Sequence, residues 1–258
     1  MNGAVQLDLF HFGVIYFLLL VVLGVMKKCK INQGKLLILA SVRMTVQLVL
    51  AGVILTLIFK NPHPAFTVLY ILCMTIFAIG MVFSKCKGLN KKFKVVIACS
   101  LAGIGISVIV FFVTVIVGEN IFNPQYTIPL GGMIIGNTVT GVSLGVKTFN
   151  ENIKTQRNKI DTLLNIGCTP QKILTPFVNN ALETALLPTL NSMMGMGIIS
   201  LPGMMTGQIL SGTLPTTAIL YQISIMIAIC SVVCFSVFCS LHFGSKTLYN
   251  KHCQIIEQ

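Results

Sequence analysis

The stretch IPLGGMIIGNTVTGVSLGVKT (residues 128–148) gives the first indication of how the chain folds. Its side chains are mostly apolar or small, and glycines recur along it every four or five residues, at Gly132, Gly136, Gly141 and Gly145. Small residues at such spacings let helices approach closely in a lipid bilayer, where packing drives association. The stretch therefore predicts a membrane-spanning helix that packs tightly against its neighbours and ends at an interfacial lysine, Lys147.

The end of this stretch, GVSLGVKT (141–148), looks like a phosphate-binding loop but has the wrong spacing. Such a loop needs four residues between its glycines and a lysine directly after the second glycine. Here three residues separate the glycines, and Val146 stands before Lys147. No other stretch fits this motif or a hydrolase or metalloprotease motif. We therefore expect no catalytic site and no cofactor in this chain.

The composition places the chain in the membrane. Of its 258 residues, 55% are hydrophobic and only 9% are charged, whereas a soluble domain carries about 25% charged residues. The net charge of +12 would suggest nucleic acid as a partner of a soluble protein. Here the basic residues fall in loops between apolar stretches, so we expect them to set the membrane topology and expect no nucleic-acid partner.

About seven stretches are long enough to cross a bilayer, since a spanning helix needs roughly 20 apolar residues. The sequence therefore predicts an all-α, polytopic membrane helix bundle. The first stretch is followed by a basic run and lacks a small-residue cleavage site, so we expect it to be retained. The predicted spans lie near 8–26, 36–59, 66–84, 95–117, 128–146, 188–211 and 216–242.

The basic residues predict the orientation. All of them except Arg43 and Lys60 fall in the loops at 27–35, 85–94 and 147–187 or in the C-terminal tail, which lie on one side of a seven-span chain. Lysine and arginine accumulate on the cytoplasmic side of membrane proteins. We therefore predict a multi-pass protein of the plasma membrane with its N-terminus outside and its C-terminus in the cytoplasm.

Residues 147–187 form a long polar segment on the predicted cytoplasmic side. In ENIKTQRNKIDTLLNIG (151–167), apolar residues recur at helical spacing, which indicates an amphipathic helix. Gly167 can end that helix in a left-handed conformation, Thr169 can cap a new helix, and Pro170 suits its first position. The segment is predicted to be a helix–turn–helix insert. A solvated connector is the alternative, but two capped helices favour a docking element for a cytoplasmic partner.

The turn of this insert matches part of a known pattern. ABC transporter permeases carry a coupling segment E-A-A-x-x-x-G, and in DTLLNIG Asp161 lies six residues before Gly167. Further stretches extend the likeness: RMTVQL, IPLGGMIIGN, GCTPQKI, ISLPGMMTGQILSG and AILYQI. Through them nearly the whole chain resembles the FetB-type ABC transporter permease family. The resemblance implies one transmembrane permease domain over 1–258, with 147–187 as its cytoplasmic coupling insert.

The resemblance also implies partners and a substrate class. The partners would be a cytoplasmic ABC ATPase, which holds the ATP, and a second copy of the permease. Bacterial members are implicated in iron export and plant relatives in aluminium tolerance and UDP-glucose export, so the substrate would be a metal ion or another small solute such as a nucleotide sugar. Members read D-x-A-K where this chain reads NSMM, with Asn191 and Met194 replacing the acid and the lysine. The expected ATPase-coupling residues are Asp161, Gly167, Thr169 and Pro170.

Several polar residues lie inside the predicted spans. A charge there costs about 2.5–3.5 kcal/mol on insertion scales, so Arg43, one turn from Gln47, should face protein or water. This placement fits a transport pathway, and it also fits a structural tie to a helix carbonyl or to Glu183. Amide side chains in spans serve as ligands or bond across helices. The amides of this kind are Asn137, Asn191 and Gln222.

The segment LPGMMTG (201–207) interrupts a predicted span. Pro202 removes a helix hydrogen bond and Gly203 loosens the backbone, which fits a hinge or pathway lining that includes Met204, or a packing kink. Methionines crowd the same segment; thioethers suit soft metal ions, and methionine is also an adaptable core filler. The residues alone therefore leave any metal site unknown.

A secondary transporter driven by an ion gradient is the alternative to an ABC permease. That class needs acidic residues within the membrane to couple protons or sodium ions. The chain has six acidic residues, and none is predicted in the middle of a span, which favours the ABC permease.

Overall fold

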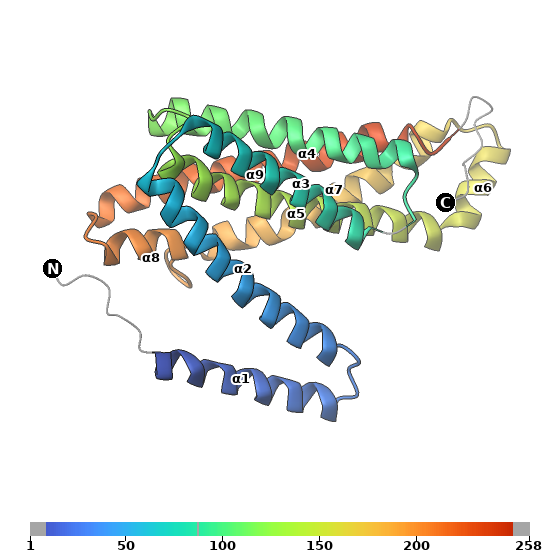
Figure 1. Ribbon diagram of the computed structural model, residues 1–258. Helices are drawn as coiled ribbons and strands as arrows, with labels where there is room; N and C mark the ends of the chain where they lie inside the picture. The colour runs from blue at the N-terminus through green and yellow to red at the C-terminus, as the bar shows by residue number, and fades with distance from the viewer. Residues whose placement is uncertain (1–8, 87, 250–258) are drawn as a thin grey trace.

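The computed structural model describes residues 9–86 and 88–249, and its named elements are all helical (Figure 1). This confirms the predicted all-α membrane helix bundle. The elements are α1 (Leu9–Lys28), α2 (Gly34–Lys60), α3 (Pro64–Lys85), α4 (Lys91–Phe111), the π-helical turn η1 (Phe112–Val117), α5 (Pro124–Thr155), α6 (Arg157–Asn165), α7 (Pro170–Gly195), α8 (Gly203–Leu210) and α9 (Pro215–Ser245).

Helix α5 is the centre of the bundle. It packs against α3, α7 and α9, and α4 packs along α9. In the apolar section of α5, 61% of the residues are buried, against 6% in α2. Side chains that reach the glycines of neighbouring helices explain this packing: a Cβ atom on Gly141 would lie 2.5 Å from Cγ1 of Val233, and one on Gly244 would lie 2.6 Å from the Phe93 ring. The helices approach one another where glycine removes the side chain.

Four of the five glycines of α5 lie on two different faces of the helix. Gly141 and Gly145 face α9 and α7, as the packing prediction requires. Gly132 and Gly136 lie about 140° further round the helix, because Gly141 is five positions after Gly136 and each position turns the helix by about 100°. A Cβ atom on Gly132 would meet only Met74 of α3, and one on Gly136 would meet nothing within 4 Å. Gly141 and Gly145 therefore allow α5 to pack closely against α7 and α9, whereas Gly132 and Gly136 leave space beside α3.

Helices α1 and α2 form a hairpin that leans away from the other helices (Figure 1). Tyr16 and Thr45 share a hydrogen bond of 2.6 Å between the two helices. Most other side chains of the hairpin are exposed and apolar, as with Leu39 and Leu48, each 65% exposed. Apolar side chains covering the outside of a helix hairpin are typical of a surface that faces lipid.

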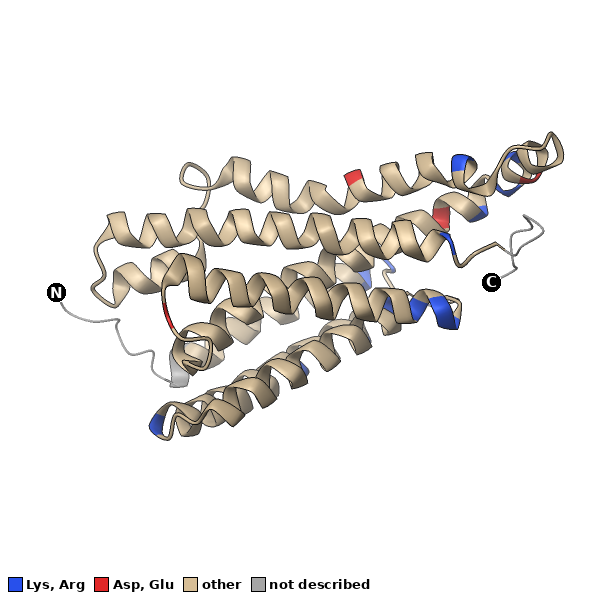
Figure 2. Ribbon diagram, turned by 90° about the horizontal axis from the view of Figure 1, so that it is seen from above, with Lys and Arg blue, Asp and Glu red and all other residues tan. Residues whose placement is uncertain are grey.

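Five helices among the described residues are long and apolar enough to cross a bilayer: α2, α3, α4 with η1, α5 and α9. Of the other two predicted spans, 8–26 corresponds to α1. The connections α1–α2 and α3–α4, helix α6 and the end of α9 lie at one end of the bundle, while α2–α3, η1–α5 and α8 lie at the other (Figure 1). Figure 2 shows the basic residues gathered towards the end that holds α6.

The sixth predicted span, 188–211, is wrong. The structure instead runs α7 from Pro170 to Gly195 through the bundle, and a loop then leads to the short helix α8. Pro188 lies inside α7 rather than starting the span. The break comes later, where Gly197 has a φ of 83° and Pro202 precedes α8.

The predicted helix–turn–helix of segment 147–187 is present as α6, the turn at Gly167 and the start of α7, but it is continuous with the bundle. The first residues of the segment continue α5, which extends to Thr155 because Phe149 and Ile153 carry the buried face of the helix beyond Lys147. Gln156 then ends α5 and begins α6. The second helix of the insert is the first half of α7. The predicted turn is therefore joined directly to a helix of the bundle.

Candidate functional site

A cavity of about 740 Å³ opens between α2, α3 and α5, and we call it the Arg43 cavity. Arg43 and Gln47 both line it from α2, as their one-turn spacing predicts. The glycines 132 and 136 of α5 form part of the opposite wall, which the absence of side chains there makes possible. Among the residues that line this cavity, Arg43 carries the only formal charge.

The predicted tie between Arg43 and Glu183 does not form. In the part of the chain that the structure describes, the ion pairs are Lys147–Glu151 at 3.8 Å and Arg157–Asp161 at 3.4 Å, both within single helices. Glu183 is exposed on α7. Ala185, two residues further along α7, lies beside Gly145 of α5, because a Cβ atom on Gly145 would be 3.3 Å from Cβ of Ala185. Glu183 is therefore an acidic residue near the middle of α7, the helix that takes the place of the predicted sixth span.

Two more cavities meet at Gln222 of α9. The first, which we call the Asn137 cavity, has a volume of about 290 Å³ between α5, α7 and α9 and is also lined by Pro202. The second, which we call the methionine cavity, has a volume of about 580 Å³ between the end of α7, the loop 196–202, α8 and α9. Gln222 is only 5% exposed and lines both cavities. Met196, Pro202 and Met226 also line both cavities, so the two spaces adjoin along this group of residues.

Of the remaining predicted pathway residues, Asn191, Gly203 and Met204 line none of the three cavities. Asn191 is exposed on α7 and lines none of these cavities. Gly203 is exposed at the start of α8. Met204 packs against the core without lining the cavities. Asn137 lines its cavity but donates its amide N–H to the carbonyl of Met133 at 2.8 Å.

The α3 wall of the Arg43 cavity was not predicted from the sequence. Tyr70, Cys73, Met74, Phe77 and Met81 all line it. Their spacing of three and four residues places them on one face of the helix. That periodicity was the available signal, but α3 is apolar on every side, so no polar contrast marked this face.

The turn between α6 and α7 has the predicted glycine geometry. Gly167 has a φ of 92°. Its N–H donates to the carbonyl of Leu164 at 2.9 Å, and the N–H of Cys168 donates to that of Leu163 at 3.0 Å. These two bonds form a Schellman motif, which favours glycine at the left-handed position. The side chain beside the turn, Ile166, is 74% exposed, so an apolar group projects from this end of the molecule.

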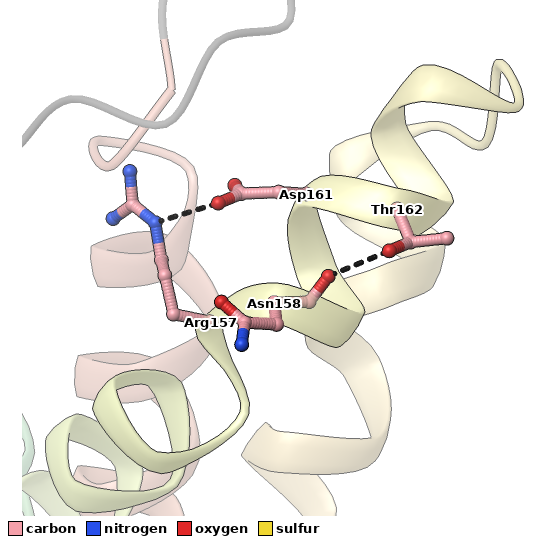
Figure 3. Close-up of polar contacts among 4 residues, drawn as sticks. All are labelled: Arg157, Asn158, Asp161 and Thr162. Carbon is pink, nitrogen blue, oxygen red and sulfur yellow. Dashed lines mark hydrogen bonds and ion pairs between the residues drawn. The ribbon is translucent and has the colours of Figure 1, made fainter.

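Pro170 occupies the first position of α7 as predicted, and Thr169 occupies the N-cap position. The predicted capping bond of Thr169 is wrong, because its side chain makes none. Asp161 lies on α6, where its Oδ2 is 3.4 Å from Nε of Arg157 (Figure 3). Both side chains are partly exposed, so this pair contributes little to stability and leaves the carboxylate on the surface beside the turn.

One helix connects the turn with the cavities. Helix α7 has 26 residues and is therefore about 39 Å long. It starts at the exposed turn and ends where Met193 and Met196 line the methionine cavity. Along its length Ala181 and Ala185 pack against α5. Pro188, which cannot donate a helix hydrogen bond, lies beside the Asn137 cavity.

Comparison with known proteins gives matches over most of the chain. Residues 9–249 match the uncharacterised protein family UPF0014. The UPF0014 membrane protein YjkA of Bacillus subtilis (strain 168) is 31% identical over 85% of this chain and 87% of its own length. The probable iron export permease protein FetB of Escherichia coli (strain K12) is 28% identical over 93% of this chain and 92% of its own. The protein ALUMINUM SENSITIVE 3 of Arabidopsis thaliana is 33% identical over 75% and 70%. No solved structure matches the chain.

Proposed function

Since the chain belongs to the uncharacterised protein family UPF0014, we propose that this multi-pass membrane protein is the permease subunit of an ABC transporter. A separate cytoplasmic ATPase hydrolyses ATP, and this chain, working as a pair of identical subunits, carries the solute out of the cell. The observation that carries the proposal is the exposed turn Asn165–Thr169, which is joined without a break to helix α7.

The turn is suited to docking because its shape is fixed and its surface is accessible. The Schellman bonds at Gly167 hold the backbone, and Ile166 offers an exposed apolar anchor. A fixed loop loses little conformational entropy on binding, which favours affinity. The basic residues around this end of the bundle (Figure 2) support a cytoplasmic location for the turn.

Helix α7 supports the transmission of a movement from the turn to the membrane. A push on the turn displaces Pro170 at the start of α7, and the helix carries that displacement about 39 Å to the cavities at its other end. Helices packed on neighbours move as units by hinge or shear. Pro188 provides a place for α7 to bend, because the hydrogen bond there is missing.

A metal ion is the first candidate substrate, because a relative that covers 93% of the chain is the probable iron export permease protein FetB. A second candidate is an anionic non-metal solute, such as a nucleotide sugar. The observation that favours it is Arg43, which brings the only formal charge among the residues that line the Arg43 cavity. A guanidinium in an apolar surrounding pairs well with a phosphate group.

The test is to replace residues of the turn and follow the partner. Gly167→Val forces a β-branched residue into the left-handed region, which costs about 1–3 kcal/mol of backbone strain. Asp161→Lys places two positive charges one turn apart on α6 and reverses the charge beside the turn. We expect both variants to reach the membrane at normal levels, to lose co-purification of the ABC ATPase, and to lose ATP-dependent transport in vesicles.

Gly212→Val is the matched control. Gly212 has a φ of 98°, and, as at Gly167, a Cβ atom there would meet nothing within 4 Å. It lies after α8, at the other end of the bundle. The backbone strain is therefore the same, but the ATPase surface is untouched, and co-purification should persist. Full ATPase binding and transport in both turn variants would refute the coupling proposal.

A further inference from the structure

The methionine cavity collects thioethers from three separate parts of the chain. Met193 and Met196 come from α7 and the residue after it, Met205 from α8, and Met226 from α9. Methionine packs well in cores as a flexible filler, so a group of thioethers alone would indicate only packing. Here the side chains line about 580 Å³ of space that they do not fill and that opens to the surface beside Ile223 and Ile227, which are 53% and 55% exposed.

Gln222 adds an oxygen to this group. Gln222 is buried, with only 5% of its surface exposed. Its Nε2 lies 3.8 Å from Sδ of Met196, and its Oε1 has no hydrogen-bond partner among the described residues. A buried amide oxygen left without a partner costs about 1–3 kcal/mol. The fold thus holds an acceptor at the cavity wall that a ligand would satisfy.

The donors have a common chemical character. Thioether sulfur is a soft ligand that prefers Cu(I) among the biological metal ions. No acidic residue lines the cavity, so no side chain neutralises the charge of a cation that enters it. The cost of burying an ion rises with the square of its charge, and an isolated buried charge is already expensive. A monovalent ion therefore suits this site better than a divalent one.

We propose that the methionine cavity is a binding site for a soft monovalent cation, Cu(I) in the cell, held by thioethers and by Oε1 of Gln222. The site lies at the end of the bundle opposite α6 (Figure 1). It goes beyond the proposed function, because the cation binds whether or not an ATPase drives the chain.

The chain contains its own control. Met194 stands between Met193 and Met196 in the sequence but is 74% exposed and does not line the cavity. Replacing methionine by leucine nearly conserves volume and usually costs less than about 1.5 kcal/mol. Met196→Leu and Met194→Leu therefore differ in the loss of a cavity sulfur while they keep the packing similar.

The experiment uses Ag(I), a soft monovalent probe without redox chemistry under these conditions. The full chain, with its cysteines replaced by alanine to remove competing thiols, is labelled with ¹³C at the methionine methyl groups and placed in lipid nanodiscs. Circular dichroism checks its helix content. If that chain does not fold, the wild-type chain with alkylated thiols replaces it. NMR then follows each methyl signal as Ag(I) is added.

We expect one equivalent of Ag(I) to shift the methyl signals of Met193, Met196, Met205 and Met226 and to leave that of Met194 in place. Met196→Leu and Gln222→Leu should each weaken binding by about tenfold or more, and Met194→Leu should not change it. Absence of a shift at one equivalent, or equal weakening by Met194→Leu and Met196→Leu, would overturn the site. Loss of ATPase binding in the Gly167 variant should leave the Ag(I) shifts unchanged, which separates this site from the transport proposal.

Discussion

Replacing Gly141 by alanine tests the packing of α5 against α9 with a single methyl group. The new Cβ atom would lie 2.5 Å from Cγ1 of Val233, whereas carbon atoms in contact are about 3.5–4.0 Å apart. One helix must therefore move by about 1 Å or the valine must leave its rotamer. Overpacking of this kind costs about 1–3 kcal/mol, and Gly141→Ala should lower the free energy of unfolding by that amount.

Gly103→Ala on α4 is the matched substitution. A Cβ atom there would meet nothing within 4 Å, so no contact opposes it. Alanine is favoured over glycine inside a helix by about 0.5–1 kcal/mol. The two substitutions make the same chemical change, yet we expect opposite signs: Gly103→Ala stabilises the fold, and Gly141→Ala destabilises it.

Val233→Ala supplies the rescue, because it removes the Cγ1 atom that the new methyl group would strike. The double variant should be more stable than the sum of the two single changes predicts, with a coupling energy of about 1 kcal/mol or more. The assay is reversible unfolding in mixed micelles as SDS is added, followed by circular dichroism. If Gly141→Ala stabilises the protein as Gly103→Ala does, or if the two changes simply add, the close approach of α5 and α9 is refuted.

Three further predictions concern topology, chemistry and thiol reactivity. A reporter fused after Gln258 should be cytoplasmic and one inserted in the loop 118–123 external, and the reverse pattern would contradict the orientation. The purified chain without a partner should not hydrolyse ATP, and activity that Lys147→Ala abolishes would restore GVSLGVKT as a nucleotide site. Burial raises the pKa of the Cys86 thiol, an effect that nearby Lys85 only partly offsets, so at pH 7 a maleimide should modify exposed Cys168 before buried Cys86; equal rates would contradict this burial.

The sequence predicted the helical features whose signals are local. Gly167 and Pro170 are recognisable because backbone conformation restricts which residues fit at a helix end and a helix start. The sixth span was misplaced because hydropathy was followed instead: α7 carries Asn180 and Glu183 on exposed positions, so its first half reads as polar although its other face is buried. Only tertiary packing reveals that Pro188 continues this helix.

The candidate site was less predictable because it depends on which helices are neighbours. Arg43 and Gln47 were found from their polarity, and the structure places both on one cavity. Asn191 is also a polar residue inside a predicted span, but it is exposed and lines none of the cavities. Met226 gave no signal, since it lies in an apolar run of α9, and it joins the other methionines only through the fold.

The loose attachment of the α1–α2 hairpin makes the Arg43 cavity a property of the membrane as well as of the chain. One wall of this cavity is α2, of which only 6% of the apolar section is buried. Lateral pressure and bilayer thickness act on such a helix through its tilt. A thicker or stiffer bilayer would set α2 at a different angle and change the volume beside Arg43, so the same polypeptide would present a different vestibule in membranes of different lipid composition.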